Sequence, residues 1–316
     1  MKFDEKKLEG SRNFATKIWN AARFVLGNLE GYVPGGPEAL TDADKWILSR
    51  LAGLAKRLDE QKEGYDFAGS AHALYEFFWN ELCDWYLEFS KGRLREEDTR
   101  LATQRNLIFV IDQALRMLHP MMPFITEEIW QKLPLQDKGP SIMVAQWPSF
   151  SSLERFVDEE AERSVELVRQ VIASVRSVRS RYQIGNKVGL EVLVKADEAS
   201  CASIEAQRDL IAKMANVEHL TIAPSVEKPK ASSAMITDDL EIFVVLEGLV
   251  DFEAERARLS KERDKLLKEK EKLDRKLSNE GFLAKAAPEV IAKSREDLES
   301  AKSSIARIEN QIAELG

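Results

Sequence analysis

The first 150 residues carry their hydrophobic side chains at the three- and four-residue spacing that is typical of amphipathic helices. The sequence TDAD at 41–44 matches a capping box, which opens helices, and a regular apolar stripe follows it: Ile47, Leu51, Leu54 and Leu58. The same spacing predicts further helices over about 4–29, 66–91, 96–118 and 125–133. Because short loops join these segments, we expect a helical bundle over residues 1–150.

The pattern changes over residues 151–249. One long helix is predicted over about 153–182 and a second near 200–214. Three apolar, β-branched runs suit strands: 188–196, 219–223 and 239–246. The stretch 226–233 between the last two is predicted to be flexible. These segments together predict a small α+β domain.

The last part of the chain, residues 250–316, has a seven-residue hydrophobic repeat. One arm carries Phe252, Leu259, Leu266 and Leu273, and the returning arm carries Ile291, Leu298, Ile305 and Ile312. Gly281 and Pro288 lie where the chain must turn between them. Such heptads need a partner helix, and the two arms can partner each other. The predicted fold class is therefore mainly α: a helical-bundle domain (1–150), a small α+β domain (151–249) and a C-terminal antiparallel coiled-coil hairpin (250–316).

The composition argues against a membrane protein. Of the 316 residues 32% are charged, and an aliphatic stretch such as IFVVL (242–246) is far short of the roughly 20 residues that a bilayer requires. The chain begins with the polar sequence MKFDEKK, without the apolar core of a secretory signal. We therefore expect a cytoplasmic protein with no membrane partner.

No catalytic or metal-binding motif emerges from the sequence. Cys83 and Cys201 lie far apart and the chain has three histidines, so no spaced ligand set exists for a metal. Phosphate-binding loops, dinucleotide fingerprints and nucleophile elbows are also missing from the sequence. We predict two reduced thiols, no catalytic residue, no metal and no cofactor for this chain.

The charge is unevenly distributed. The net charge of −8 argues against a protein that binds nucleic acid with its whole surface. From Arg256 to Lys276, however, there are 10 basic and 5 acidic residues. This local excess on one arm of the hairpin could bind the phosphates of an RNA.

Two helices carry candidate RNA-binding residues. Trp46 lies about 110° from the centre of the apolar stripe of its helix, on the side of Arg50. The indole could be a platform for an unstacked base, or it could pack against a neighbouring helix or the loop 31–37. Asn20 and Arg23 lie off the apolar stripe of the first helix, where they could read base edges or be ordinary solvated residues.

Several motifs resemble those of one enzyme family. The segments RNFATKIWNAARFVLGNL (12–29), LTDADKWILSRL (40–51), YDFAGSAHALYEFFWNELCDWYLEFSK (65–91) and LRMLHPMMPFITEEIWQKL (115–133) resemble the anticodon-binding region of bacterial valyl-tRNA synthetases. The segment RKLSNEGFLAKAAPEVI (275–291) resembles the C-terminal coiled-coil arm of the same family. The motifs occur in the family's order and cover nearly the whole chain.

The resemblance implies that the partner is the tRNA for valine. Arg23 and Trp46 match positions at which the family approaches the anticodon, although the family can carry a phenylalanine in place of Trp46. Asn20 and Arg50 are further candidates beside them. On the arm, the family uses basic residues against the outer corner, or elbow, of the tRNA. The candidates there are Lys272, Arg275, Lys276 and Arg295.

The sequence also departs from the family. Family members carry a catalytic domain, normally N-terminal in the same chain, with HIGH and KMSKS signatures, and they use ATP and Mg²⁺. Neither signature occurs in this sequence. The resemblance therefore implies a tRNA-binding portion, expected to be a monomer, that does not aminoacylate tRNA by itself. The alternative is a coiled-coil interaction or oligomerisation protein that does not use tRNA, because heptads alone do not distinguish the two.

Overall fold

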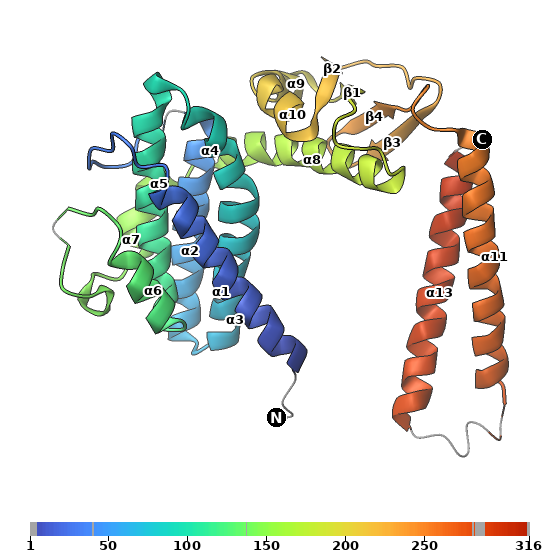
Figure 1. The fold of residues 1–316 in the computed structure, drawn as a ribbon, viewed down its shortest axis with the longest axis horizontal. Coiled ribbons are helices and arrows are strands. Elements are labelled where there is room, and N and C mark those ends of the chain that lie inside the picture. The colour runs from blue at the N-terminus through green and yellow to red at the C-terminus, as the bar shows by residue number, and fades with distance from the viewer. Residues whose placement is uncertain (1–4, 40, 137, 280, 282–287, 315–316) are drawn as a thin grey trace. The chain divides into compact units, whose positions relative to one another are not determined.

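The chain folds into two compact units. The structure, a computed structural model, describes residues 5–39, 41–136, 138–279, 281 and 288–314. The helical unit comprises Met1–Gln170 and Ala202–Met214, and the sheet-and-arm unit comprises Val171–Cys201 and Ala215–Gly316 (Figure 1). The predicted fold class, mainly α with a small α+β part, is confirmed. The three-domain division at residues 150 and 249 stays a prediction.

The helical unit is built from the predicted helices. In chain order they are α1 (Glu5–Leu26), α2 (Asp42–Glu63), α3 (Phe67–Glu76), the π-helix η1 (Phe77–Tyr86), α4 (Leu87–Arg93), α5 (Glu97–Leu118) and α6 (Pro123–Trp130). Shorter turns follow as η2 (Ile142–Val144), α7 (Phe150–Leu153) and η3 (Glu154–Phe156). The helix α8 (Glu159–Arg181) contributes to both units, as does α9 (Glu198–Glu205), and α10 (Arg208–Ala215) follows it.

Helix α2 is the centre of the helical unit. The capping box forms as predicted: the Thr41 side chain accepts from the backbone N–H of Asp44, and the Asp44 carboxylate accepts from the Thr41 N–H. The four stripe residues that were predicted from the spacing are all buried: Ile47, Leu51, Leu54 and Leu58. Neighbours cover α2 on several sides, because α3, η1, α5, α7 and η3 all pack against it.

Asp44 also belongs to a buried polar network. Its carboxylate accepts hydrogen bonds from the Tyr86 hydroxyl at 2.8 Å and from Nη1 of Arg93 at 2.7 Å. Burial, and then the negative charge of Asp44, raise the pKa of Tyr86 well above its ordinary value. One carboxylate thus joins the start of α2 to η1 and α4.

The third predicted helix, 66–91, contains both α-helical and π-helical segments. Residues Phe67–Arg93 are helical throughout, but Phe77–Tyr86 are a π-helix, in which hydrogen bonds span five residues and the winding is looser. As a result the fully buried positions step by four: Leu74, Phe78, Leu82 and Tyr86. At the end of η1, Tyr86 is fully buried, whereas the neighbouring Trp85 is half-buried.

A four-stranded sheet forms the first part of the sheet-and-arm unit. Its strands are β1 (Leu190–Lys195), β2 (Val217–Ala223), β3 (Ser232–Ile236) and β4 (Glu241–Val245), in the order β2-β1-β4-β3. β1 pairs with β2 in parallel, and with β4 in the antiparallel direction. The stretch predicted to be flexible, 226–233, runs into β3. Among the described strands β3 pairs with β4 alone, and it carries two serines, so its sequence lacks the apolar signal of a central strand.

Two long helices form the arm. α11 (Phe252–Leu277) and α13 (Pro288–Glu314) lie side by side (Figure 1) and run in opposite directions. Heptad residues fill the seam between them: Leu259, Leu298, Ala301, Ile305 and Ile308 are buried. The antiparallel hairpin is confirmed, whereas supercoiling of its helices stays a prediction. Much of the predicted turn at 278–290 lies outside the described residues.

Candidate nucleic-acid interface

The outer face of α1 presents two of the predicted residues. Helix α1 packs onto the bundle through Ile18 and Val25, and this contact turns Asn20 and Arg23 outward. Both are exposed, and no described residue forms a hydrogen bond or ion pair with either side chain. Their donors and acceptors are therefore available to a ligand at this face.

The sequence analysis missed an aromatic residue on the same face. Trp19 is 37% exposed and lies four residues before Arg23, so the two side chains are neighbours on the helix surface. Its position beside the buried Ile18, off the apolar stripe, is the signal that could have identified it. Trp19, Asn20 and Arg23 together form what we call the α1 surface.

Trp46 does not lie at the surface. Only 1% of it is exposed, so the expectation of an outward-facing stacking platform is wrong, and the alternative of packing against a neighbouring helix is confirmed. The ring contacts Phe89 of α4 edge-on, with centroids 6.2 Å apart, and the Arg169 guanidinium lies 5.6 Å from its centroid. The angle of Trp46 from the apolar stripe suggested exposure, but neighbouring helices cover α2 on several sides and not only along that stripe.

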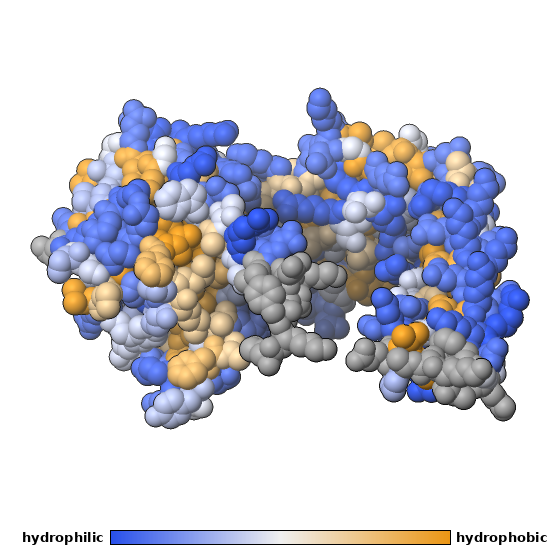
Figure 2. All heavy atoms as spheres, turned by 60° about the horizontal axis from the view of Figure 1, so that its bottom comes forward, coloured by the Kyte–Doolittle hydropathy of each residue, from blue (hydrophilic) through white to orange (hydrophobic). Residues whose placement is uncertain are grey.

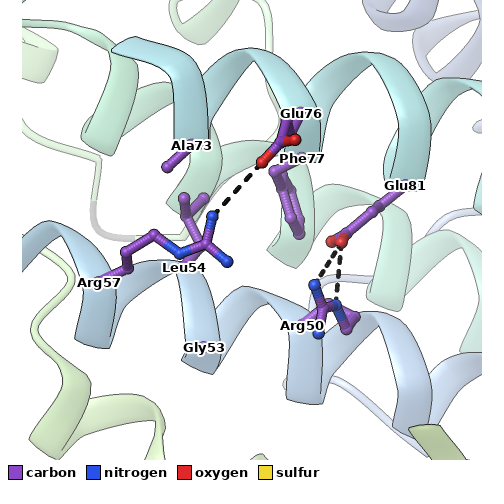
Figure 3. Close-up of a pocket in the computed structure, with 8 residues that line it drawn as sticks. All are labelled: Arg50, Gly53, Leu54, Arg57, Ala73, Glu76, Phe77 and Glu81. Atoms are coloured by element: carbon purple, nitrogen blue, oxygen red, sulfur yellow. Dashed lines mark hydrogen bonds and ion pairs between the residues drawn. The ribbon is translucent and has the colours of Figure 1, made fainter. Parts of the chain in front are cut away.

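Arg50 is also engaged within the protein. Its guanidinium donates to Glu81 from Nε at 2.9 Å and from Nη2 at 2.6 Å, and to Glu162 from Nη1 at 3.1 Å (Figure 3). Burial alone would lower the pKa of Arg50, but the two carboxylates outweigh it and raise that pKa. Arg50 is therefore paired within the protein, and its predicted contact with the anticodon stays a prediction.

The small cleft beside Arg50 is not an anion site. It lies between α2 and the helices α3 and η1, and Figure 3 shows that each arginine lining it points toward a carboxylate. Besides the Arg50 pair, Nη1 of Arg57 lies 3.4 Å from the Glu76 carboxylate. With the two positive charges matched by two negative ones, the cleft offers no net attraction to phosphate.

The four predicted arm residues are all exposed. Lys272, Arg275 and Lys276 lie in the last turns of α11, and Nζ of Lys276 donates to Ser294 of α13 at 3.1 Å. This contact brings Arg295, the next residue, to the same end of the hairpin. Arg275 forms a 3.5 Å ion pair with the exposed Glu271, whereas no described residue pairs with the side chains of Lys272 and Arg295. On the face drawn in Figure 2, hydrophilic side chains cover most of the hairpin.

We also searched the described residues for metal sites, reactive thiols and membrane-spanning helices. No group of three His, Cys, Asp or Glu side chains among them is placed to hold a metal ion. Both cysteines are free thiols, and burial raises the pKa of Cys83 to about 12. In the part of the chain that the structure describes, no helix has the length and apolar character needed to cross a bilayer.

Comparison with known proteins first gives the class. Residues 44–194 match the family model of the anticodon-binding domain of tRNA ligases, and residues 251–316 match that of the valyl-tRNA synthetase tRNA-binding arm. These two matches confirm the resemblance seen in the sequence.

Individual relatives then point to one ligase. The valine–tRNA ligase of Thermotoga maritima is 38% identical over 315 residues, which is 100% of this chain and 35% of the relative. That of Symbiobacterium thermophilum is 37% identical over 100% of this chain and 37% of the relative. That of Carboxydothermus hydrogenoformans is 40% identical over 94% of this chain and 34% of the relative. The chain thus spans about a third of the length of these relatives.

Proposed function

We propose that this chain binds the tRNA for valine, with the α1 surface at the anticodon and the end of the hairpin at the tRNA elbow. The observation that carries the proposal is the match of residues 251–316 to a tRNA-binding arm, on the same chain as an anticodon-binding domain. The exposed cations on both parts support it, because cations neutralise RNA phosphates.

At the anticodon, three neighbouring side chains each make a different kind of contact with the RNA. The exposed face of Trp19 stacks on an unpaired base, an interaction worth about 1–3 kcal/mol per base. The Arg23 guanidinium binds a phosphate or a base edge, and the Asn20 amide supplies one donor group and one acceptor. Trp46 acts only by holding α2 and α4 together.

At the elbow, the arm acts through charge. Lys272, Arg275, Lys276 and Arg295 bind backbone phosphates, which position the RNA without reading its sequence. Two separate contacts on one RNA strengthen each other, because the first raises the effective concentration for the second. Specificity then comes from the α1 surface and affinity from both.

The remaining properties follow from the relatives. We assign the chain no aminoacylation activity of its own, since it lacks the HIGH and KMSKS signatures. ATP and Mg²⁺ belong with the catalytic domain, and the described residues form no group that would hold the metal. We place the function in the cytoplasm, in a monomer whose catalytic domain precedes these residues in the same chain.

Titration tests the proposal. The chain is titrated with valine tRNA and with a variant of that tRNA carrying a swapped anticodon, at two salt concentrations. Valine tRNA should bind more tightly than the swapped variant, and more weakly at the higher salt. Equal binding of both would contradict anticodon recognition. If sedimentation instead shows a stable dimer that does not bind tRNA, the oligomerisation alternative is supported.

A further inference from the structure

Four lysines form a row along one face of α11: Lys261, Lys265, Lys268 and Lys272, which we call the lysine stripe. Their spacing of four, three and four residues keeps them within about 60° of one another around the helix. At a rise of about 1.5 Å per residue, the stripe is about 16 Å long. All four side chains are exposed. Lys272 is already a candidate for the tRNA elbow, but the other three have no role so far.

The packing of the hairpin fixes the direction of this face. Leu259 and Leu266 of α11 form an apolar cluster with Ile308 of α13, and the two helices pack against each other over their length (Figure 1). The stripe lies about 130° around α11 from these leucines. The contact that holds the hairpin together therefore turns the lysine stripe away from α13.

The carboxylates of α11 leave the charge of the stripe largely uncancelled. No described carboxylate forms an ion pair with a stripe lysine, and the nearest ones lie about 70–90° to either side. Glu269 is one of these, and it could balance at most one of the four charges. Most of the others are paired with cations off the stripe: Glu255 and Glu262 with Arg258, Asp264 with Arg263, Glu271 with Arg275, and Asp274 with Lys270.

The composition of the face favours one class of ligand. It carries no aromatic side chain, so it lacks the stacking platforms that bind single-stranded nucleic acid. The apolar side of α11 is occupied by α13, so the helix has no free face to insert into a membrane surface. Interfaces between proteins are depleted in lysine. A straight row of flexible point charges instead suits the regularly spaced phosphates of a double helix.

We propose that the lysine stripe binds consecutive phosphates along a base-paired stem of an RNA. The hairpin then lies along the stem with the outer face of α11, in addition to touching the tRNA elbow with its end. Such a contact reads the shape of the stem and not its sequence, as is usual for double-stranded RNA. The inference rests on the proposed function, because the RNA is the bound tRNA, and Lys272 makes the stripe continuous with the elbow candidates.

A triple variant tests the stripe. Lys261→Gln, Lys265→Gln and Lys268→Gln are combined, and Lys272 is kept because it also belongs to the elbow candidates. The matched control combines Lys293→Gln, Lys302→Gln and Arg307→Gln, which remove the same charge from exposed positions of α13. Circular dichroism shows whether both variants are folded. Each is titrated over a range of salt concentrations with valine tRNA, with a loop-free RNA duplex and with single-stranded RNA of the same length.

The unaltered chain should bind the duplex more tightly than the single strand. For tRNA and duplex alike, the stripe variant should reduce the salt slope of the binding constant by about 2–3, since each phosphate contributes about 0.7–0.9. That change corresponds to roughly 100-fold weaker binding at 0.1 M salt. The control should change both quantities much less. Ethylation interference should identify neighbouring phosphates within one tRNA stem that affect binding to the unaltered chain but not to the stripe variant.

Equal effects of the stripe variant and the control would overturn the inference, because charge at a distance would then explain both. An unchanged salt slope in the stripe variant would overturn it too, as would equal binding of duplex and single strand. In these cases binding of valine tRNA to the unaltered chain would leave the proposed function standing. Binding of the duplex through the stripe without binding of valine tRNA would support the stripe and remove the proposed function.

Discussion

At the scale of single residues, two tryptophans of similar chemistry have opposite roles. Trp46 is enclosed by α4 and Arg169, whereas Trp19 presents more than a third of its surface beside Arg23. Removal of the first should therefore affect stability, and removal of the second should affect binding.

Trp46→Ala should lower the free energy of unfolding by about 3–5 kcal/mol, because it empties a large buried site. Trp19→Ala should leave stability within about 0.5 kcal/mol, as is usual for surface positions. It should weaken tRNA binding by about 1–3 kcal/mol, the value of one stacked base. Urea unfolding and tRNA titration of both variants measure these effects. Unchanged tRNA binding of Trp19→Ala would exclude Trp19 from the interface.

The buried Asp44 predicts a second residue-scale effect. Arg93→Met removes the guanidinium that lies 2.7 Å from this fully buried carboxylate. The unpaired charge should lower the free energy of unfolding by about 3–5 kcal/mol. Arg57→Met is the matched control, since its pair with Glu76 is exposed and should be worth less than about 1 kcal/mol. Similar losses in both variants would contradict the buried network.

Cys83 predicts a loss of stability at alkaline pH. Its pKa is raised from 9.0 to about 12, so above pH 9 the unfolded chain loses the thiol proton while the folded chain keeps it. The free energy of unfolding should therefore fall by about 1.4 kcal/mol per pH unit over this window. In urea unfolding at pH 8 to 11, Cys83→Ala should show a shallower decline. Cys201→Ala, at a half-buried thiol, should alter the decline less.

At the scale of elements, the sequence predicted what depends on local chemistry. The capping box at Thr41 and the heptads of the hairpin gave correct helices because each reports a local contact. Two features could not be predicted. The π winding of η1 shifts which aromatic residue is buried, and the spacing of Trp85 and Tyr86 does not encode that shift. The edge strand β3 forms because β4 offers hydrogen-bonding partners, although its own residues are weakly apolar.

The hairpin should lose stability independently of the helical unit. Leu298→Ala removes a buried seam residue and should cost about 2 kcal/mol. Amides of α11 and α13 should then exchange with deuterium roughly 30-fold faster, following the usual factor of ten per 1.36 kcal/mol. Amides of α2 should be unaffected. The exposed Glu296→Ala is the control, and accelerated exchange in α2 would mean that the hairpin and the bundle unfold as one.

At the scale of the whole molecule, local charge matters more than net charge. The chain carries −8 overall, yet its arm ends in four exposed cations. Counting charge over the short segment 256–276 predicted this basic region, which the net charge of the whole chain conceals. The exposed side of α1 was predicted only in part, because exposure depends on how neighbouring helices cover each face.

Replacing Lys272, Arg275, Lys276 and Arg295 together by glutamine should reduce the salt slope of tRNA binding by about 3, since each phosphate contact contributes about 0.7–0.9. The preference for the correct anticodon should remain. Arg258→Gln is the control, because that guanidinium is already paired with Glu255 and Glu262. An unchanged slope in the fourfold variant would exclude the hairpin end from the complex.

The π-helix has a consequence for any change in chain length. Deleting one residue within Phe77–Tyr86 would allow ordinary α winding, which forms more favourable hydrogen bonds locally. Ordinary α winding turns by about 100° per residue, whereas the observed step of four positions corresponds to about 90° per residue. Nine residues of α-helix therefore turn about as far as the ten residues of the π-helix, so Tyr86 would still face Asp44 and Phe89 would still face Trp46. A deletion that regularises this helix should therefore be tolerated better than a deletion of one residue within α5, which would rotate everything after it by about 100°.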